Sequence, residues 1–305
     1  MTSEKDRIIA KVYFDEAGYG SIAATLTYAK KYDPNITSED VKKWKERNTE
    51  RKTNLRGFNS FVVDKPFEEF QMDLAFFFDL NKETNDKTYL GILLMVDIFT
   101  KYTAVVLIKT NTIPDILEAI KECLKKMGGK PETIYGDNEG AWSVGTLIDK
   151  YFQQEKIRHI ITRSHAPVAE RQIRTIKSMV YQRVEKTKRK WYDVIGPVVL
   201  VYNNKMVHSS IKMTPSDARK PSNELSVKLN LQLNRTRMRK YPNVSVGDHV
   251  KLYRKKDKLD KERKSLWSAN SYKVENITQS AGQAMFKLSG IANPVLRHEI
   301  LLVEN

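Results

Sequence analysis

The sequence predicts an α/β protein in which a mixed sheet is flanked by a small helical unit and a small β unit. Apolar strand-like runs in the middle of the chain give way to alternating helices and strands. The first 60 residues carry helix signals, and about the last sixty carry short strand patterns. The 305 residues are enough for two or three domains with separate cores. We expect domains at residues 1–60, 66–221 and 222–305.

Two helices are predicted in the first domain, at residues 22–29 and from about residue 37, on either side of a tight turn. Each follows a hydroxyl side chain suited to cap a helix. Two short helices around a tight turn resemble a helix-turn-helix, and the second one carries Lys42 and Lys43. We expect these two lysines to contact DNA. The alternative is a helical hairpin that serves packing.

The middle domain opens with strand-like runs at 67–78, 89–99 and 102–108, separated by polar turns, which favours an antiparallel meander. Alternating elements follow: predicted helices 113–127, 147–155, 168–186 and 191–203, and predicted strands 132–135 and 157–162. Three strands followed by alternating helices and strands is the element order of the ribonuclease H-like fold.

The last domain begins with a basic connector that contains Arg237 and Arg239. Several short strand patterns follow within about sixty residues and indicate a small β-barrel of the SH3 or chromo type. A basic loop at residues 255–264, which begins with Lys255 and Lys256, lies between its first strands. On such a barrel these side chains would suit a phosphate backbone, whereas the alternative is a solvated loop.

The charge of the chain points to a polyanionic partner. Its net charge is +16, and the last 84 residues hold 16 Lys and Arg against 8 Asp and Glu. Half of the excess positive charge therefore lies in little more than a quarter of the chain. Solubility alone is the simpler explanation, but a surplus of this size favours nucleic acid.

Other classes of protein are disfavoured. No run of eighteen apolar residues is present, so we expect no membrane span. The first six residues are charged and lack an apolar signal region, so secretion is not indicated. A single cysteine, Cys123, excludes an intramolecular disulfide and fits a reducing compartment.

Three acidic residues indicate the chemistry. Asp73 lies within the apolar run 70–78, Asp137 follows the strand-like residues 133–136, and Glu170 opens a basic helix. A carboxylate inside an apolar strand is costly unless it is paired or binds a metal. Three carboxylates that a fold brings together commonly hold two divalent cations for phosphoryl transfer.

Helical geometry separates two stripes on the helix that begins near Glu170. Arg174 and Lys177 lie on the same stripe as Glu170, and an apolar stripe lies roughly 80° away. The apolar stripe is predicted to pack on the sheet and consists of Ile173, Ile176, Val180 and Val184. Glu170 would then face the metal site, with Arg174 and Lys177 placed to receive DNA phosphates. The alternative is a surface ion pair between Glu170 and Arg174.

These motifs resemble those of retroviral-type (DDE) integrases. Residues 170–177 look like the catalytic-glutamate helix of that family, 135–138 like its second aspartate with an Asp-Asn pair, and 70–73 like the strand of its first aspartate. The segment 202–215 resembles the one that closes the integrase core. The flanking domains are most similar to those of integrases from Polinton/Maverick elements and virophages, on the strength of Val41-Lys42-Lys43-Trp44, Val246-Gly247-Asp248 and Leu266-Trp267-Ser268.

The sequence departs from the family in three respects. The first 65 residues contain no histidine or cysteine, so no zinc is expected there. Asp137 and Glu170 have 32 residues between them, a few fewer than is usual in the family. The third residue after the glutamate, commonly Asn, is Ile173.

The resemblance implies a polynucleotidyl transferase in which Asp73, Asp137 and Glu170 hold two Mg²⁺ or Mn²⁺ ions about 4 Å apart. Water would first trim the 3′ end of a linear element, and the new 3′-hydroxyl would then attack target DNA. Asn138 would contact DNA or serve as a turn residue. We expect a homo-multimer on double-stranded DNA, chromatin contact through the barrel, and location in a host nucleus or in virus particles.

Two alternatives remain open. One is a ribonuclease H-like nuclease or a cut-and-paste transposase, although a plain nuclease would need neither flanking domain. The other is a domesticated DNA- or chromatin-binding protein that has lost its activity. The presence of all three acidic residues argues against this second alternative, because one neutral substitution would destroy metal binding.

Overall fold

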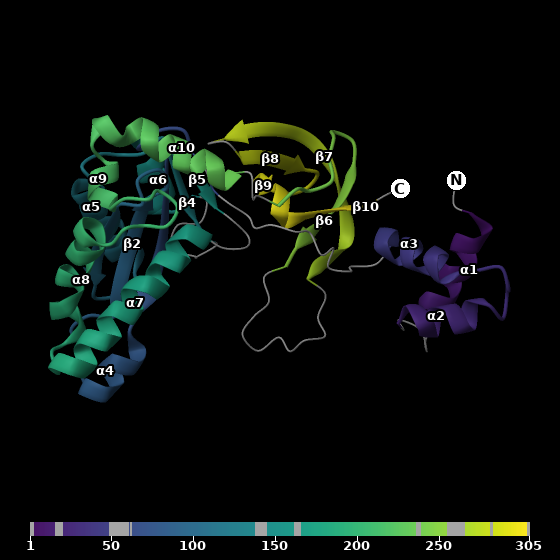
Figure 1. Cartoon of the computed structure of the whole chain (residues 1–305), viewed down its shortest axis with the longest axis horizontal. Coiled ribbons are helices and arrows are strands. Elements are labelled where there is room, and N and C mark those ends of the chain that lie inside the picture. Colours follow the sequence, from purple (N-terminus) through teal and green to yellow (C-terminus); the bar gives the residue numbers. More distant parts are fainter. Residues whose placement is uncertain are drawn as a thin grey trace.

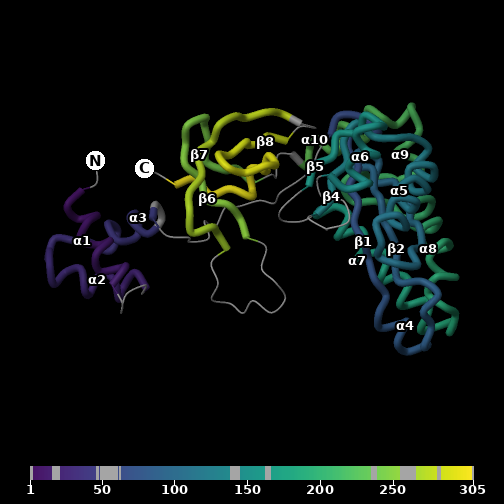
Figure 2. The backbone as a smooth tube through the Cα atoms, turned by 180° about the vertical axis from the view of Figure 1, so that it is seen from behind, coloured from purple at the N-terminus to yellow at the C-terminus, as the bar shows by residue number. Residues whose placement is uncertain are grey.

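The computed structural model describes residues 3–15, 21–48, 61, 63–137, 145–161, 166–235, 239–254, 266–280 and 283–303. Figures 1 and 2 show three bodies in a row: the N-terminal helices at one end, the α/β core at the other, and the C-terminal β unit between them. No helix in the described ranges is both long and apolar enough to cross a membrane.

The core is built on one mixed sheet. Its strands are β1 (Glu69–Phe76), β2 (Gly91–Asp97), β3 (Thr103–Ile108), β4 (Thr133–Gly136) and β5 (Arg158–Ile161), in the order β3-β2-β1-β4-β5. β1, β2 and β3 pair antiparallel, whereas β4 runs parallel to both β1 and β5. The predicted meander followed by alternating helices and strands is confirmed.

Helices cover both faces of this sheet. The even-numbered residues of β1, such as Phe70 and Met72, pack against α5 (Ile113–Met127) and α6 (Leu147–Gln154). The opposite face packs against α7 (Pro167–Thr187) and α8 (Trp191–Lys205). Successive strand residues point to opposite faces, so each strand feeds both cores. Figure 1 shows α7 lying across one face of the sheet.

Two predictions about the core need correction. The first strand was predicted to reach residue 78, but β1 ends at Phe76 and residues from Phe78 begin helix α4 (Phe78–Thr84). The predicted basic connector contains a helix, α10 (Glu224–Arg235), which follows α9 (Pro215–Ala218) and η2 (Pro221–Asn223). The side-chain amides of Asn230 and Asn234 bind α10 to the carbonyl oxygens of Ile211 and Ser210. This part of the connector therefore belongs to the core.

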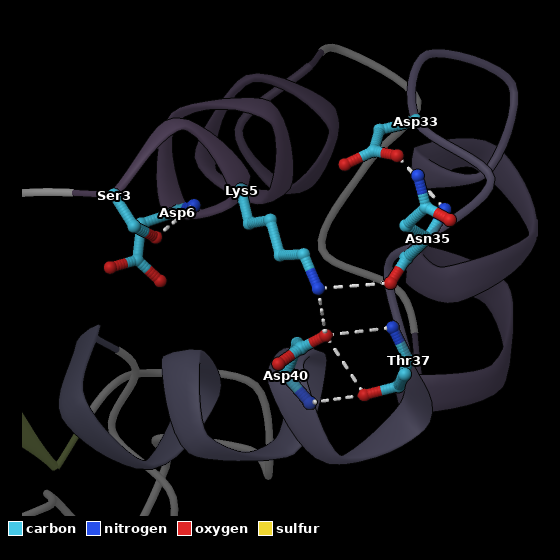
Figure 3. A network of polar contacts seen from close by, with 7 residues as sticks. All are labelled: Ser3, Lys5, Asp6, Asp33, Asn35, Thr37 and Asp40. Carbon is cyan, nitrogen blue, oxygen red and sulfur yellow. Dashed lines mark hydrogen bonds and ion pairs between the residues drawn. The ribbon is translucent and has the colours of Figure 1, made fainter.

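The N-terminal unit contains α1 (Glu4–Tyr13), α2 (Ile22–Ala29) and α3 (Ser38–Asn48), so a helix precedes the predicted pair. Its apolar core includes Ile9, Ala29, Ile36, Val41 and Trp44. Asp40 accepts hydrogen bonds from the backbone N–H and the hydroxyl of Thr37, both at 2.9 Å, and lies 3.1 Å from Nζ of Lys5 (Figure 3). These bonds, those from Thr37 first, lower the pKa of Asp40 to about 2.

The C-terminal unit is an antiparallel sheet of β6 (His249–Tyr253), β7 (Trp267–Ser280), β8 (Gln283–Leu288), β9 (Val295–Leu296) and β10 (Ile300–Val303), with η3 (Arg297–Glu299) between the last two. The strand order is β10-β6-β7-β8-β9. This unit packs on the core, because the hydroxyl of Tyr135 lies 3.8 Å from Sδ of Met285. The ring of Phe61 packs edge-on against the ring of Tyr135, with centroids 5.4 Å apart.

Candidate active site

Asp73 and Asp137 are placed by the register of two neighbouring strands. β1 and β4 are parallel, and their register pairs Gln71 with Tyr135. Asp73 lies two residues beyond Gln71 within β1, and Asp137 lies two residues beyond Tyr135, after the last strand residue Gly136. Asp137 directly follows the end of β4 and is 6% exposed. Asp73 shares the face of Gln71 by strand alternation, and Asp137 follows Tyr135 of the same core, so we expect the two residues to lie close together.

Glu170 lies in the first turn of α7, the helix that covers this same face. Two contacts fix α7 along β1. The side-chain oxygen of Gln71 accepts from the backbone N–H of Val168 at 2.9 Å and of Ala169 at 3.4 Å. Nζ of Lys177 donates to the carbonyl oxygen of Phe76 at 2.6 Å. The helix therefore runs in the direction of β1.

Asp73 lies between the two β1 residues that make these contacts, Gln71 and Phe76. Its position along the strand can therefore be compared with the position of Glu170 along the helix. Asp73 is two strand residues beyond Gln71, about 7 Å along β1. Glu170 is one to two helical residues beyond the first contact, about 2 Å along α7. Asp73 and Glu170 therefore both lie between the two contacts that join α7 to β1.

Asp73, Asp137 and Glu170 belong to β1, to the end of β4 and to the first turn of α7, the helix that packs on this sheet. In the part of the chain that the structure describes, no three His, Cys, Asp or Glu side chains are grouped so as to hold a metal ion. The chemistry of the donor set does suit Mg²⁺ or Mn²⁺, because both ions prefer carboxylate oxygens. The residue types therefore fit these ions.

Sequence comparison finds similarity to a transposon-derived protein. No family model matches the sequence. A putative uncharacterized transposon-derived protein of Caenorhabditis elegans is 24% identical over 206 residues, which cover 67% of this chain and 68% of that protein.

Structural comparison addresses the fold. The structure is similar over 99% of its length to a chain from the intasome of simian T-cell lymphotropic virus in complex with PP2A regulatory subunit B56 gamma, also covered over 99%, with a TM-score of 0.58 and 12% identity. The core has an integrase-like fold. The catalytic core domain of HTLV-2 integrase, solved with magnesium, matches 52% of this chain over 100% of its own length, with a TM-score of 0.44 and 17% identity.

The integrase-like core also buries charged groups that the sequence analysis missed. Glu69 is fully buried, and burial raises its pKa to about 8. Lys101 is 5% exposed, and burial lowers its pKa to about 8. Burial also raises the pKa of Asp97, whose carboxylate accepts from the hydroxyl of Thr100 at 2.6 Å. The alternation of Glu69, Gln71 and Asp73 in an apolar strand is the sequence feature that could have revealed the buried Glu69.

The two cations predicted on α7 differ in their surroundings. Arg174 is exposed, and it lines an open groove of about 530 Å³ along the helix with Arg171, Thr175, Ser178, Met179 and Gln182. Lys177 is half-buried, and its ammonium group lies 5.1 Å from the centroid of the Phe77 ring besides binding the carbonyl of Phe76. The predicted apolar stripe is confirmed, since Ile173, Ile176 and Val180 are buried.

Three of the other predicted DNA contacts, Lys42, Lys43 and Arg239, lie in described parts of the flanking units. Lys42 and Lys43 are exposed on α3, and Nζ of Lys42 lies 3.9 Å from the carboxylate of Glu39. Arg239 is half-buried. The remaining four lie outside the described residues, namely Asn138, Arg237, Lys255 and Lys256.

Proposed function

We propose that this chain is a retroviral-type integrase or transposase that trims the 3′ ends of linear DNA and joins them to target DNA. The observation that carries the proposal is that Asp73 lies in β1, Asp137 directly follows the neighbouring parallel strand β4, and Glu170 lies in the first turn of the helix that packs on β1, in an integrase-like fold. The similarity to a transposon-derived protein supports the same class of activity.

Asp73 and Asp137 would hold the divalent ions from the sheet, and Glu170 would complete the ligand set from α7. When bound, two Mg²⁺ or Mn²⁺ ions would activate the attacking oxygen and stabilise the leaving 3′-oxygen. The buried position of Asp137 would keep its carboxylate oriented and partly shielded from bulk water. Arg174, exposed beside the site, would bind a DNA phosphate.

The flanking units would supply further DNA contacts. Lys42 and Lys43 project from the second helix of the predicted helix-turn-helix pair, and the C-terminal unit would act as an SH3- or chromo-like barrel. We propose a multimer on two DNA ends, which the likeness to an intasome chain supports. An origin in a Polinton-like element or virophage and action in a host nucleus complete the proposal, and they rest on the sequence motifs alone.

The test is strand transfer of a labelled DNA duplex with terminal repeats into a plasmid, with Mg²⁺ or Mn²⁺. Glu170→Gln is the critical variant. Glu185→Gln, the same chemical change at an exposed position near the other end of α7, is its matched control. The proposal predicts joined product with the unmodified chain and the control, and none with Glu170→Gln.

Two results would contradict the proposal. Metal-dependent nicking without joining, with the correct DNA ends supplied, would favour a ribonuclease H-like nuclease. DNA binding without cleavage in either metal would favour an inactive DNA- or chromatin-binding protein.

A further inference from the structure

β1 carries an unusual set of polar side chains on the face that packs against α7. Glu69, Gln71 and Asp73 alternate along the strand and therefore share this face. Glu69 and Gln71 are both fully buried. Burying an amide or a carboxyl group is unfavourable unless its hydrogen-bonding atoms find partners. The side chain of Gln71 meets this requirement through bonds at both ends.

The oxygen of the Gln71 amide accepts hydrogen bonds from the backbone N–H groups at the start of α7. The first N–H groups of a helix have no partner within the helix. In α7 the first residue is Pro167, which has no N–H, and the first backbone bond within the helix starts at Glu170. The two N–H groups left over belong to Val168 and Ala169, and Gln71 accepts from both. The residue before the helix, Ala166, provides no side-chain cap.

The nitrogen of the same amide points the other way. Nε2 of Gln71 donates to Oε1 of Glu69 at 3.4 Å. An amide has one accepting and one donating end, so a fixed acceptor on one side determines which end faces the helix. Glu69 thus orients Gln71, and Gln71 in turn holds the turn of α7 that carries Glu170.

We propose that Gln71 is a positioning residue for Glu170: it ties the first turn of α7 to the strand of Asp73 and so sets the distance between the two carboxylates. The proposal rests on the proposed function. It also follows that Gln71 acts on one end of the helix, because the bond between Lys177 and Phe76 holds α7 beyond Asp73. Loss of the Gln71 bonds should loosen the first turn and leave the rest of α7 docked.

Gln71→Met tests the link, because it keeps the length of the side chain and removes both hydrogen-bonding ends. We expect faster amide hydrogen exchange at Val168 and Ala169, with unchanged exchange near Lys177. Mutation of a group that orients a metal ligand commonly lowers metal affinity or activity by 10- to 100-fold. We therefore expect the joining rate to fall by about 10- to 100-fold and the Mg²⁺ concentration for half-maximal joining to rise, with DNA affinity unchanged.

Gln71→Glu is the rescue variant. The introduced carboxylate keeps an acceptor for the two N–H groups, and the protonated carboxyl of Glu69 can donate to it at pH 7. Exchange protection and most of the joining rate should return. Gln232→Met makes the same change as the first variant on the exposed surface of α10 and should behave as the unmodified chain.

Two outcomes would overturn the proposal. One is unchanged exchange at Val168 and Ala169 in Gln71→Met. The other is a normal joining rate and normal Mg²⁺ requirement in that variant although protection is lost. If the unmodified chain joins no DNA, the proposed function fails, and the exchange measurement alone decides whether Gln71 holds the helix.

Discussion

The strand-borne carboxylates and the helix-borne carboxylate reach the same face of the core by different means. Asp73 lies within β1, which pairs with β2 and β4, and Asp137 directly follows β4, in a sheet that helices cover on both faces. Glu170 is positioned by a helix whose contacts with β1 include the side chains of Gln71 and Lys177. A strand register changes only if a whole ladder is broken, whereas the start of a helix can shift when one side chain is lost. The third carboxylate should therefore be the adjustable one.

The largest effect is expected at the strand pair. Asp73→Asn and Asp137→Asn should each lower the joining rate by about 1,000-fold or more, because a neutral amide replaces a charged metal ligand of the same shape. The measurement is the single-turnover joining rate with Mg²⁺. Asp193→Asn, an exposed position on α8, is the control and should leave the rate unchanged. A rate within tenfold of normal in Asp73→Asn would remove that residue from the site.

The sequence predicted the stripe of α7 on which Glu170 lies and the apolar stripe beside it, because the 3.6-residue repeat of a helix determines a face directly. It could not reveal the partners of Gln71, since Val168 lies 97 residues away in the chain and the bonds go to backbone groups. The grouping of the three carboxylates is likewise a tertiary property. Among the described residues, no three His, Cys, Asp or Glu side chains are grouped so as to hold a metal ion.

Helix α10 lies in a segment for which the sequence analysis predicted only a basic connector. Apolar residues occupy every second position at Leu225, Val227, Leu229, Leu231 and Leu233, which is the period of a strand. In the structure Val227 and Leu231 are buried, whereas Leu225, Leu229 and Leu233 are more than half exposed. The hydrogen bonds of Asn230 and Asn234 to the core and the burial of Val227 and Leu231 therefore outweigh the preference of this alternating pattern for a strand.

Glu69 has a raised pKa, so between about pH 4.5 and 8 the folded chain retains a proton that the unfolded chain has lost. Stability contributed by this group is therefore lost as pH rises through that window. Glu69→Gln removes the titration and keeps an acceptor for Gln71.

We expect Glu69→Gln to be more stable than the unmodified chain at pH 8, by on the order of 2 kcal/mol, and to show a smaller difference at pH 5. Chemical denaturation at the two pH values is the measurement. Asp97, Glu68 and Lys101 also act on Glu69 and are unchanged in the variant, so they are present on both sides of the comparison. A gain of stability that is equal at both pH values would contradict the assignment.

The second anchor of α7 gives a smaller effect. Lys177→Met removes a charged hydrogen bond to the carbonyl of Phe76 and should lower the free energy of unfolding by about 1–3 kcal/mol. Denaturant unfolding measures this change, with Lys186→Met, an exposed position in the last turn of α7, as the control. An unchanged stability, combined with a large loss of DNA affinity, would instead identify Lys177 mainly as a phosphate ligand.

The smallest effect is expected at Arg174, whose side chain is exposed on the same helix. Arg174→Ala should leave stability nearly unchanged and weaken DNA binding to the same extent for all sequences. The slope of the logarithm of affinity against the logarithm of salt concentration should become shallower by about 1, because one phosphate contact is lost. Binding isotherms at several salt concentrations provide the slope. An unchanged slope would show that Arg174 contacts no phosphate.

The central claim is that Asp73, Asp137 and Glu170 act as one metal site although they reach it from strands and a helix. The most direct measurement is Mn²⁺ binding to the full chain, followed by the paramagnetic resonance signal of free Mn²⁺. We expect Asp73→Asn, Asp137→Asn and Glu170→Gln each to weaken binding by about tenfold or more, and Glu185→Gln to leave binding unchanged. Binding to Glu170→Gln as tight as to the unmodified chain would contradict the account.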